Sequence, residues 1–115
     1  MSRMNLAELQ ANALRAAALL KSMSNPSRLL VLCQLSEGEK SVGELERAVG
    51  VSQSALSQHL ALLRHQNIVA TRRAGQTIYY SLEGKEASAV LATLFEVFCS
   101  KSPKARVRRM KTSPA

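Results

Sequence analysis

The segment that most constrains the fold is residues 41–63, SVGELERAVGVSQSALSQHLALL. Ser41 and Glu44 match a capping box, in which each side chain accepts a hydrogen bond from the backbone N–H of the other residue. Gly50 can supply the left-handed residue that ends this first helix, and Ser52 can cap a second helix directly after the turn. Two helices joined by such a short turn form a helix-turn-helix.

The second helix of this pair has two different faces. Leu56, Leu60 and Leu63 recur at i, i+4 and i+7, which predicts that these leucines face the core. The opposite face bears small and amide side chains. Such side chains can read base edges in the major groove, although they are also common on a solvated surface. We expect the helix to contact DNA through Gln53, Ser54, Ser57, Gln58, His59 and Arg64.

Positive charge is spread unevenly along the 115 residues. The net charge is +8, but six basic residues and no acidic residue lie within residues 101–115, which leaves +2 for residues 1–100. Residues 52–82 include three arginines and no acidic residue. An acid-free surface is what contact with a phosphate backbone requires. The basic end either adds non-specific DNA affinity or is a solvated extension.

Three further helices are predicted outside the helix-turn-helix. One covers residues 5–23, with Asn5 and Glu8 as a capping box, and a second starts at Asn25 and Pro26 and ends near Leu35. The third covers residues 85–98 and carries an apolar stripe.

A β-hairpin is expected between the helix-turn-helix and the last helix. Residues 68–73 and 76–82 have strand-like patterns, and Ala74 with Gly75 fits the turn between them. Such a ribbon would be the wing of a winged helix. Alternation predicts that Ile78, Tyr80 and Leu82 face inward, and the residues expected to contact DNA are Arg72, Arg73 and Gln76.

These elements define the predicted fold class, which is mainly α with a small β-hairpin: a winged helix-turn-helix in residues 1–100, followed by a basic, disordered tail in residues 101–115. The first and last helices hold more apolar surface than one small core can cover. We expect them to pair in a homodimer, the alternative being that one protomer uses both fully. The predicted interface residues are Leu6, Leu9, Ala13, Leu91, Leu94 and Phe98.

Several classes of protein do not fit the sequence. No segment has the length and flanks of a signal peptide or a membrane span, which predicts a cytoplasmic protein with its two cysteines as thiols. There is no nucleophile–base pair and no phosphate-binding loop, so we expect neither enzymatic activity nor a cofactor.

The order of elements resembles the ArsR/SmtB family of bacterial repressors. Residues 20–29 (LKSMSNPSRL) resemble the family's segment before its second helix, residues 52–60 (SQSALSQHL) its recognition helix and residues 72–80 (RRAGQTIYY) its wing. The resemblance covers about residues 6–100. It implies a dimeric repressor that binds an inverted-repeat operator in double-stranded DNA.

The chain departs from the metal-sensing members of that family. Their sites use cysteines in the helix before the turn, or Asp, His and Glu on the last helix, and neither helix has such a set here. His59 and His65 are six residues apart, which does not suit a shared helical ligand face. No metal site is expected, and His59 is either a polar side chain near the DNA backbone or a packed imidazole.

Cys33 and Cys99 resemble the dithiol pair of a subgroup whose repressors sense persulfides, to which a haemolysin regulator is related. The resemblance implies that oxidation links the two thiols and releases the operator. The alternative is that both are small buried hydrophobic residues. The expected function is therefore a repressor that senses reactive sulfur or other thiol oxidants. The alternatives are a regulator without thiol sensing, constitutive or anti-repressing, and a metalloid-responsive repressor.

Overall fold

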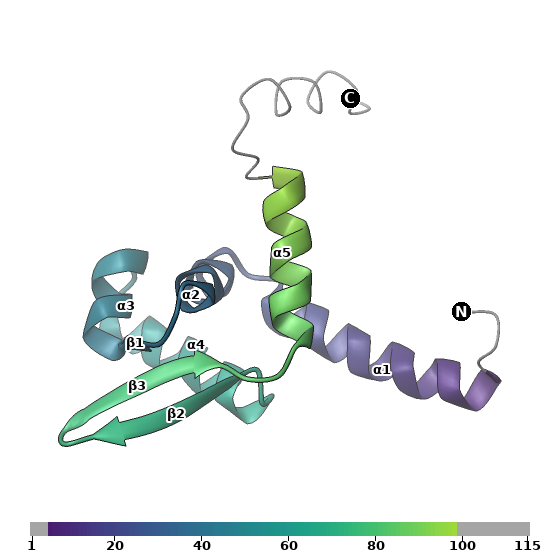
Figure 1. Cartoon of the computed structure of the whole chain (residues 1–115), viewed down its shortest axis with the longest axis horizontal. Coiled ribbons are helices and arrows are strands. Elements are labelled where there is room, and N and C mark those ends of the chain that lie inside the picture. The colour runs from purple at the N-terminus through teal and green to yellow at the C-terminus, as the bar shows by residue number, and fades with distance from the viewer. Residues whose placement is uncertain (1–4, 99–115) are drawn as a thin grey trace.

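The computed structural model describes residues 5–98 and contains the predicted helices and wing (Figure 1). Cys99 and the basic tail lie outside the described residues. In chain order the elements are α1 (Leu6–Met23), α2 (Pro26–Ser36), β1 (Lys40–Ser41), α3 (Val42–Val49), α4 (Gln53–His65), β2 (Val69–Ala74), β3 (Thr77–Leu82) and α5 (Glu86–Phe98).

The predicted caps of the helix-turn-helix are confirmed. The Ser41 side chain accepts a hydrogen bond from the Glu44 N–H at 3.2 Å, and the Glu44 carboxylate accepts one from the Ser41 N–H at 2.8 Å. Gly50 ends α3 with a φ of 74°, in the left-handed region that favours glycine. Ser52 then caps α4 by accepting from the Ala55 N–H. These caps fix the two helices at a tight turn.

The capping box predicted for α1 is present only in part. The Asn5 side chain accepts from the Glu8 N–H at 2.8 Å, as expected. The Glu8 carboxylate accepts from the Asn5 side-chain amide instead of the backbone N–H.

The wing has three strands instead of the predicted two, in the order β1-β3-β2, all antiparallel. The extra strand is only two residues long, too short for a periodic pattern, and Ser41 serves both in it and as the cap of α3. The predicted turn residues are wrong by one position. Ala74 pairs with Thr77, so the turn consists of Gly75 and Gln76.

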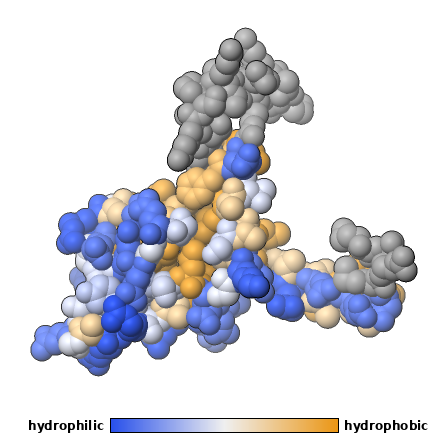
Figure 2. Space-filling view, viewed as in Figure 1, coloured by the Kyte–Doolittle hydropathy of each residue, from blue (hydrophilic) through white to orange (hydrophobic). Residues whose placement is uncertain are grey.

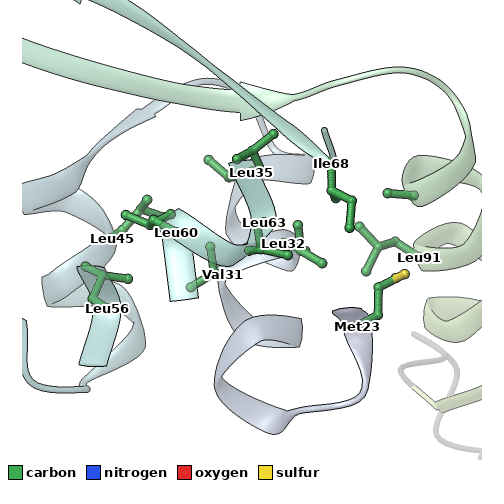
Figure 3. Close-up of a cluster of buried hydrophobic side chains, with 12 residues drawn as sticks. Met23, Val31, Leu32, Leu35, Leu45, Leu56, Leu60, Leu63, Ile68 and Leu91 are labelled. Atoms are coloured by element: carbon green, nitrogen blue, oxygen red, sulfur yellow. The ribbon is translucent and has the colours of Figure 1, made fainter. Parts of the chain in front are cut away.

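The core lies where α2, α4 and α5 meet, and its side chains are shown in Figure 3. Leu56, Leu60 and Leu63 are buried, as the spacing predicted. Leu91 of α5 is also buried in this core, and therefore the prediction that it lies in a dimer interface is wrong. Ile78, predicted to face inward, is 40% exposed because it lies toward the tip of the hairpin, while Tyr80 and Leu82 pack against the core.

Much of α1 extends away from the rest of the protomer (Figure 1). Only its last turn is buried, through Ser22 and Met23. Leu6 and Leu14 are 70% and 74% exposed, and Phe98 at the end of α5 is 69% exposed. Figure 2 shows an apolar strip along α5 and mainly hydrophilic side chains over the wing. Within residues 5–98, no helix combines the length and hydropathy of a membrane span.

Candidate DNA interface and thiol site

The recognition helix α4 presents the polar face that the sequence predicted. Its buried leucines fix the helix on the core, and the opposite side is left to solvent. The exposed side chains on that side are Gln53, Ser54, Ser57, Gln58, Ala61 and Arg64. The first turn of α4 therefore offers hydroxyl and amide groups, together with the positive end of the helix dipole.

His59 differs from the other predicted contacts of α4. It is half-buried, and its pKa is lowered from 6.5 mainly by burial and further by the positive charge of Arg28 on α2. The imidazole is therefore neutral at physiological pH and lies close enough to Arg28 of α2 to be affected by its charge. Among residues 5–98 no three His, Cys, Asp or Glu side chains are grouped to hold a metal ion.

A hollow of about 560 Å³ lies between the recognition helix and the wing. Ser57, Arg64 and His65 line it from α4, and Tyr80 lines it from β3. Arg64 is exposed and has no acidic partner among the described residues. This side of α4 can therefore accept a phosphate backbone without first breaking an ion pair.

The two wing arginines lie on opposite faces of β2. Arg73 is two residues from Thr71, the register partner of Tyr80, so Arg73 shares the face of the wing that borders the hollow. It is exposed, as is Gln76 in the turn, and the described part of the chain offers Arg73 no ion-pair partner.

Arg72 points to the other face and is already paired. Its Nε and its Nη2 donate hydrogen bonds of 2.9 and 2.7 Å to the two carboxylate oxygens of Glu39. The absence of acidic residues from positions 52–82 therefore does not leave Arg72 without an acidic neighbour. Glu39 precedes the acid-free segment by more than ten residues, and the pairing of β1 with β3 brings it back to the wing.

Cys33 lies in α2 and is half-buried, packed against the core. Its partner in the predicted pair, Cys99, follows directly after Phe98, the last residue of α5, and falls outside the described residues. Helices α2 and α5 are in contact. The described residues therefore include Cys33 itself, the helix α2 that carries it, and the helix α5 that directly precedes Cys99 in the sequence.

Two side chains that shape the candidate site and its supporting helices were not singled out from the sequence. Glu39 had no recognisable pattern because its partner is 33 residues away. Arg28 was noted only as part of a resemblance, but its Nε donates a 2.6 Å hydrogen bond to the carbonyl oxygen of Ser22 and so connects α2 with α1.

A helix-turn-helix with an exposed polar second helix and an adjacent three-stranded wing defines a winged-helix DNA-binding regulator. The model for bacterial regulatory proteins of the arsR family matches residues 25–71. The transcriptional activator HlyU of Vibrio cholerae is 47% identical over 96 residues, which cover 84% of this chain and 89% of HlyU. The biofilm growth-associated repressor of Xylella fastidiosa is 42% identical over 98 residues, covering 85% and 86%. The chain belongs to the ArsR family.

Solved structures agree with this assignment. Reduced HlyU from V. cholerae matches with a TM-score of 0.78 at 45% identity, over 83% of this chain and 100% of that chain. The repressor BigR from X. fastidiosa matches with a TM-score of 0.77 at 42% identity, over 85% and 100%. The homodimeric winged helix-turn-helix DNA-binding domain of Mb0332 from Mycobacterium bovis has a TM-score of 0.71 at 27% identity, over 84% and 89%. DNA binding and homodimers are typical of the family.

Proposed function

We propose that this ArsR-family regulator is a homodimeric repressor that binds an inverted-repeat operator and releases it when Cys33 and Cys99 are oxidised. The observation that best supports the DNA-binding part is the exposed polar face of α4 above three buried leucines. In this proposal Gln53, Ser54, Ser57 and Gln58 contact bases and phosphates, while Arg64, Arg73 and Gln76 contact the backbone. His59 serves to position α4.

The proposed dimer interface consists of the apolar surface of α1 and α5 that the protomer leaves uncovered. Leu6, Leu9 and Phe98 are the largest exposed members of the predicted set. The relative Mb0332 is homodimeric and shares the fold, which supports a homodimer but does not bear on which helices form its interface. A two-fold axis would present two copies of α4 about one turn of DNA apart.

The proposed sensing reaction uses a persulfide, RSSH, as the oxidant. The Cys33 thiolate attacks the outer sulfur of RSSH, forming a Cys33 persulfide and releasing RSH. The Cys99 thiolate then attacks the Cys33 sulfur, which forms the disulfide and releases the terminal sulfur as H2S. Two thiols are oxidised by two electrons while RSSH is reduced to RSH and H2S. A bridging trisulfide would consume two RSSH and release two RSH and one H2S.

A second candidate is a regulator of the same DNA-binding type that does not sense thiol state. The packing of the half-buried Cys33 against the core favours this candidate, because a cysteine in such a position often serves only as a small hydrophobic residue. Mass spectrometry of the full chain after treatment with a persulfide separates the two. The proposed sensor should lose two hydrogens or gain bridging sulfur between Cys33 and Cys99, whereas unmodified thiols would favour the second candidate.

DNA binding is tested by selecting duplexes from a random library with the reduced protein. An inverted repeat with half-sites about 10 base pairs apart is expected. Sedimentation of the protein alone should give a dimer at micromolar concentration. The double variant Leu6→Glu with Leu9→Glu should shift it to monomer, while Ala11→Glu on the opposite side of the same helix should not. A library without enrichment, or a wild-type monomer, would contradict the proposal.

A further inference from the structure

A pair of charged side chains reaches across the whole wing. Ser41 of β1 and Arg72 of β2 are both register partners of Tyr79 on the central strand β3. Residues opposite one another in antiparallel strands point to the same face, so Arg72 and Tyr79 share one face of the sheet. The guanidinium of Arg72 lies over the Tyr79 ring, 4.8 Å from its centroid, and reaches Glu39 on the far side.

Glu39 occupies the donors of Arg72 that a phosphate would need. A carboxylate and a phosphate both present two oxygens in the spacing that suits a bidentate guanidinium. Both Glu39 oxygens accept from Arg72, at 2.7 and 2.9 Å. The same hydrogen bonding is the main reason that the pKa of Glu39 is lowered, and the carboxylate therefore stays ionised at physiological pH.

Other cations near the proposed DNA interface are arranged differently. Arg64 and Arg73 are exposed and have no acidic partner within residues 5–98. The side chain of Arg72 is also largely exposed, so burial does not keep it from DNA. The carboxylate of Glu39 is what distinguishes Arg72 from these two.

We infer that Glu39 is an intramolecular competitor for DNA phosphate, which withholds Arg72 from the backbone and limits the sequence-independent affinity of the protein. The inference rests on the proposed DNA binding. Each phosphate contact adds to affinity for any sequence through counterion release. Withholding one arginine therefore lowers binding to DNA of every sequence by the same electrostatic contribution.

The test compares Glu39→Gln with the matched control Glu37→Gln. Both variants remove one negative charge from the same loop region, but Glu37 pairs with Lys40 instead of Arg72. Affinity for a random-sequence duplex and for the selected operator is measured by fluorescence anisotropy from about 50 to 200 mM salt, the range in which phosphate contacts dominate the change. Thermal unfolding checks that each variant keeps the wild-type fold.

The inference predicts that Glu39→Gln, compared with Glu37→Gln, steepens the slope of log K against log salt by about 0.9 on both duplexes. A change in slope of this size makes binding tighter by at most about eightfold at 0.1 M salt. In an Arg72→Gln background the effect of Glu39→Gln should disappear.

Two outcomes would overturn the inference while leaving the proposed function intact. Equal slopes for Glu39→Gln and Glu37→Gln would show that Arg72 is not withheld. Weaker binding of folded Glu39→Gln would show that Glu39 supports the wing instead of competing for phosphate. If the wild-type protein binds neither duplex at any salt concentration, the proposed function itself fails.

Discussion

The Nε of Arg28 donates a 2.6 Å hydrogen bond to the carbonyl oxygen of Ser22 and so closes the junction between α1 and α2. Ser22 is buried, and its carbonyl belongs to the last turn of α1, where helical carbonyls lack an intrahelical partner. The charged donor thus satisfies an acceptor that water reaches poorly. Since α1 is the helix that extends toward the proposed partner protomer, this bond also helps to set where the dimer surface lies.

Replacing Arg28 should destabilise this junction. For Arg28→Ala we expect the free energy of unfolding to fall by about 1–3 kcal/mol, because a buried carbonyl loses a charge-assisted hydrogen bond. Chemical denaturation measures the change. Lys21→Ala, which removes an exposed cation from the same turn of α1, is the control and should stay close to wild type. Equal stabilities for the two variants would mean that the bond contributes little.

The polar face of α4 should determine operator affinity. Ser57→Ala and Gln58→Ala should each cost about 1–3 kcal/mol of operator binding where a good base contact is lost, and should relax sequence preference. Anisotropy titrations with the operator and with single-base variants measure both effects. Ser88→Ala, an exposed serine on α5, is the control. If the two α4 variants fold and bind like this control, these residues do not belong to the interface.

The two arginines of the wing should differ in their effect on salt dependence. Arg73→Gln should reduce the slope of log K against log salt by about 0.9, because Arg73 has no competing acid and can neutralise one phosphate. Arg72→Gln should reduce it less, since Glu39 already holds that side chain. The same slope for both variants would contradict the inference that Glu39 withholds Arg72 from DNA.

Stability should depend on pH through His59. Its pKa in the folded protein lies below the ordinary 6.5, so the unfolded chain takes up a proton first as the pH falls. The stability that the neutral imidazole provides is complete above about pH 6.5 and is lost progressively as the pH drops toward the lowered native pKa. Urea unfolding between about pH 7.5 and 5.5 should therefore show a smaller decline for His59→Gln than for wild type. His65→Gln, which removes an exposed imidazole from the same helix, is the control, and an undiminished decline in His59→Gln would exclude His59 as the cause.

The parts of the fold that could be predicted are those specified by neighbouring residues. Ser41, Gly50 and Ser52 specify the helix-turn-helix through caps that involve only three or four consecutive positions. The strand β1 could not be predicted, because two residues carry no periodicity and its pairing with Tyr79 and Tyr80 depends on the tertiary fold.

The candidate site was predictable to a similar extent. The exposed face of α4 follows from the spacing of its leucines. The pairing of Arg72 with Glu39 spans 33 positions and passes through β3, which no local pattern signals. Likewise, Leu91 has the spacing of an interface residue but packs in the core of its own protomer. The same apolar pattern on α5 would suit either position, so the sequence alone does not distinguish them.

Oxidation of Cys33 and Cys99 is proposed to release the operator, and one titration series tests this release. Operator affinity is measured by anisotropy for wild type, Cys33→Ser and Cys99→Ser, each before and after treatment with a persulfide. We expect about a hundredfold weaker binding for treated wild type, a change of about 2.7 kcal/mol, with both serine variants binding like the reduced protein throughout. Treated wild type that keeps its operator affinity, or a serine variant that loses it as wild type does, would show that these two thiols do not control DNA release.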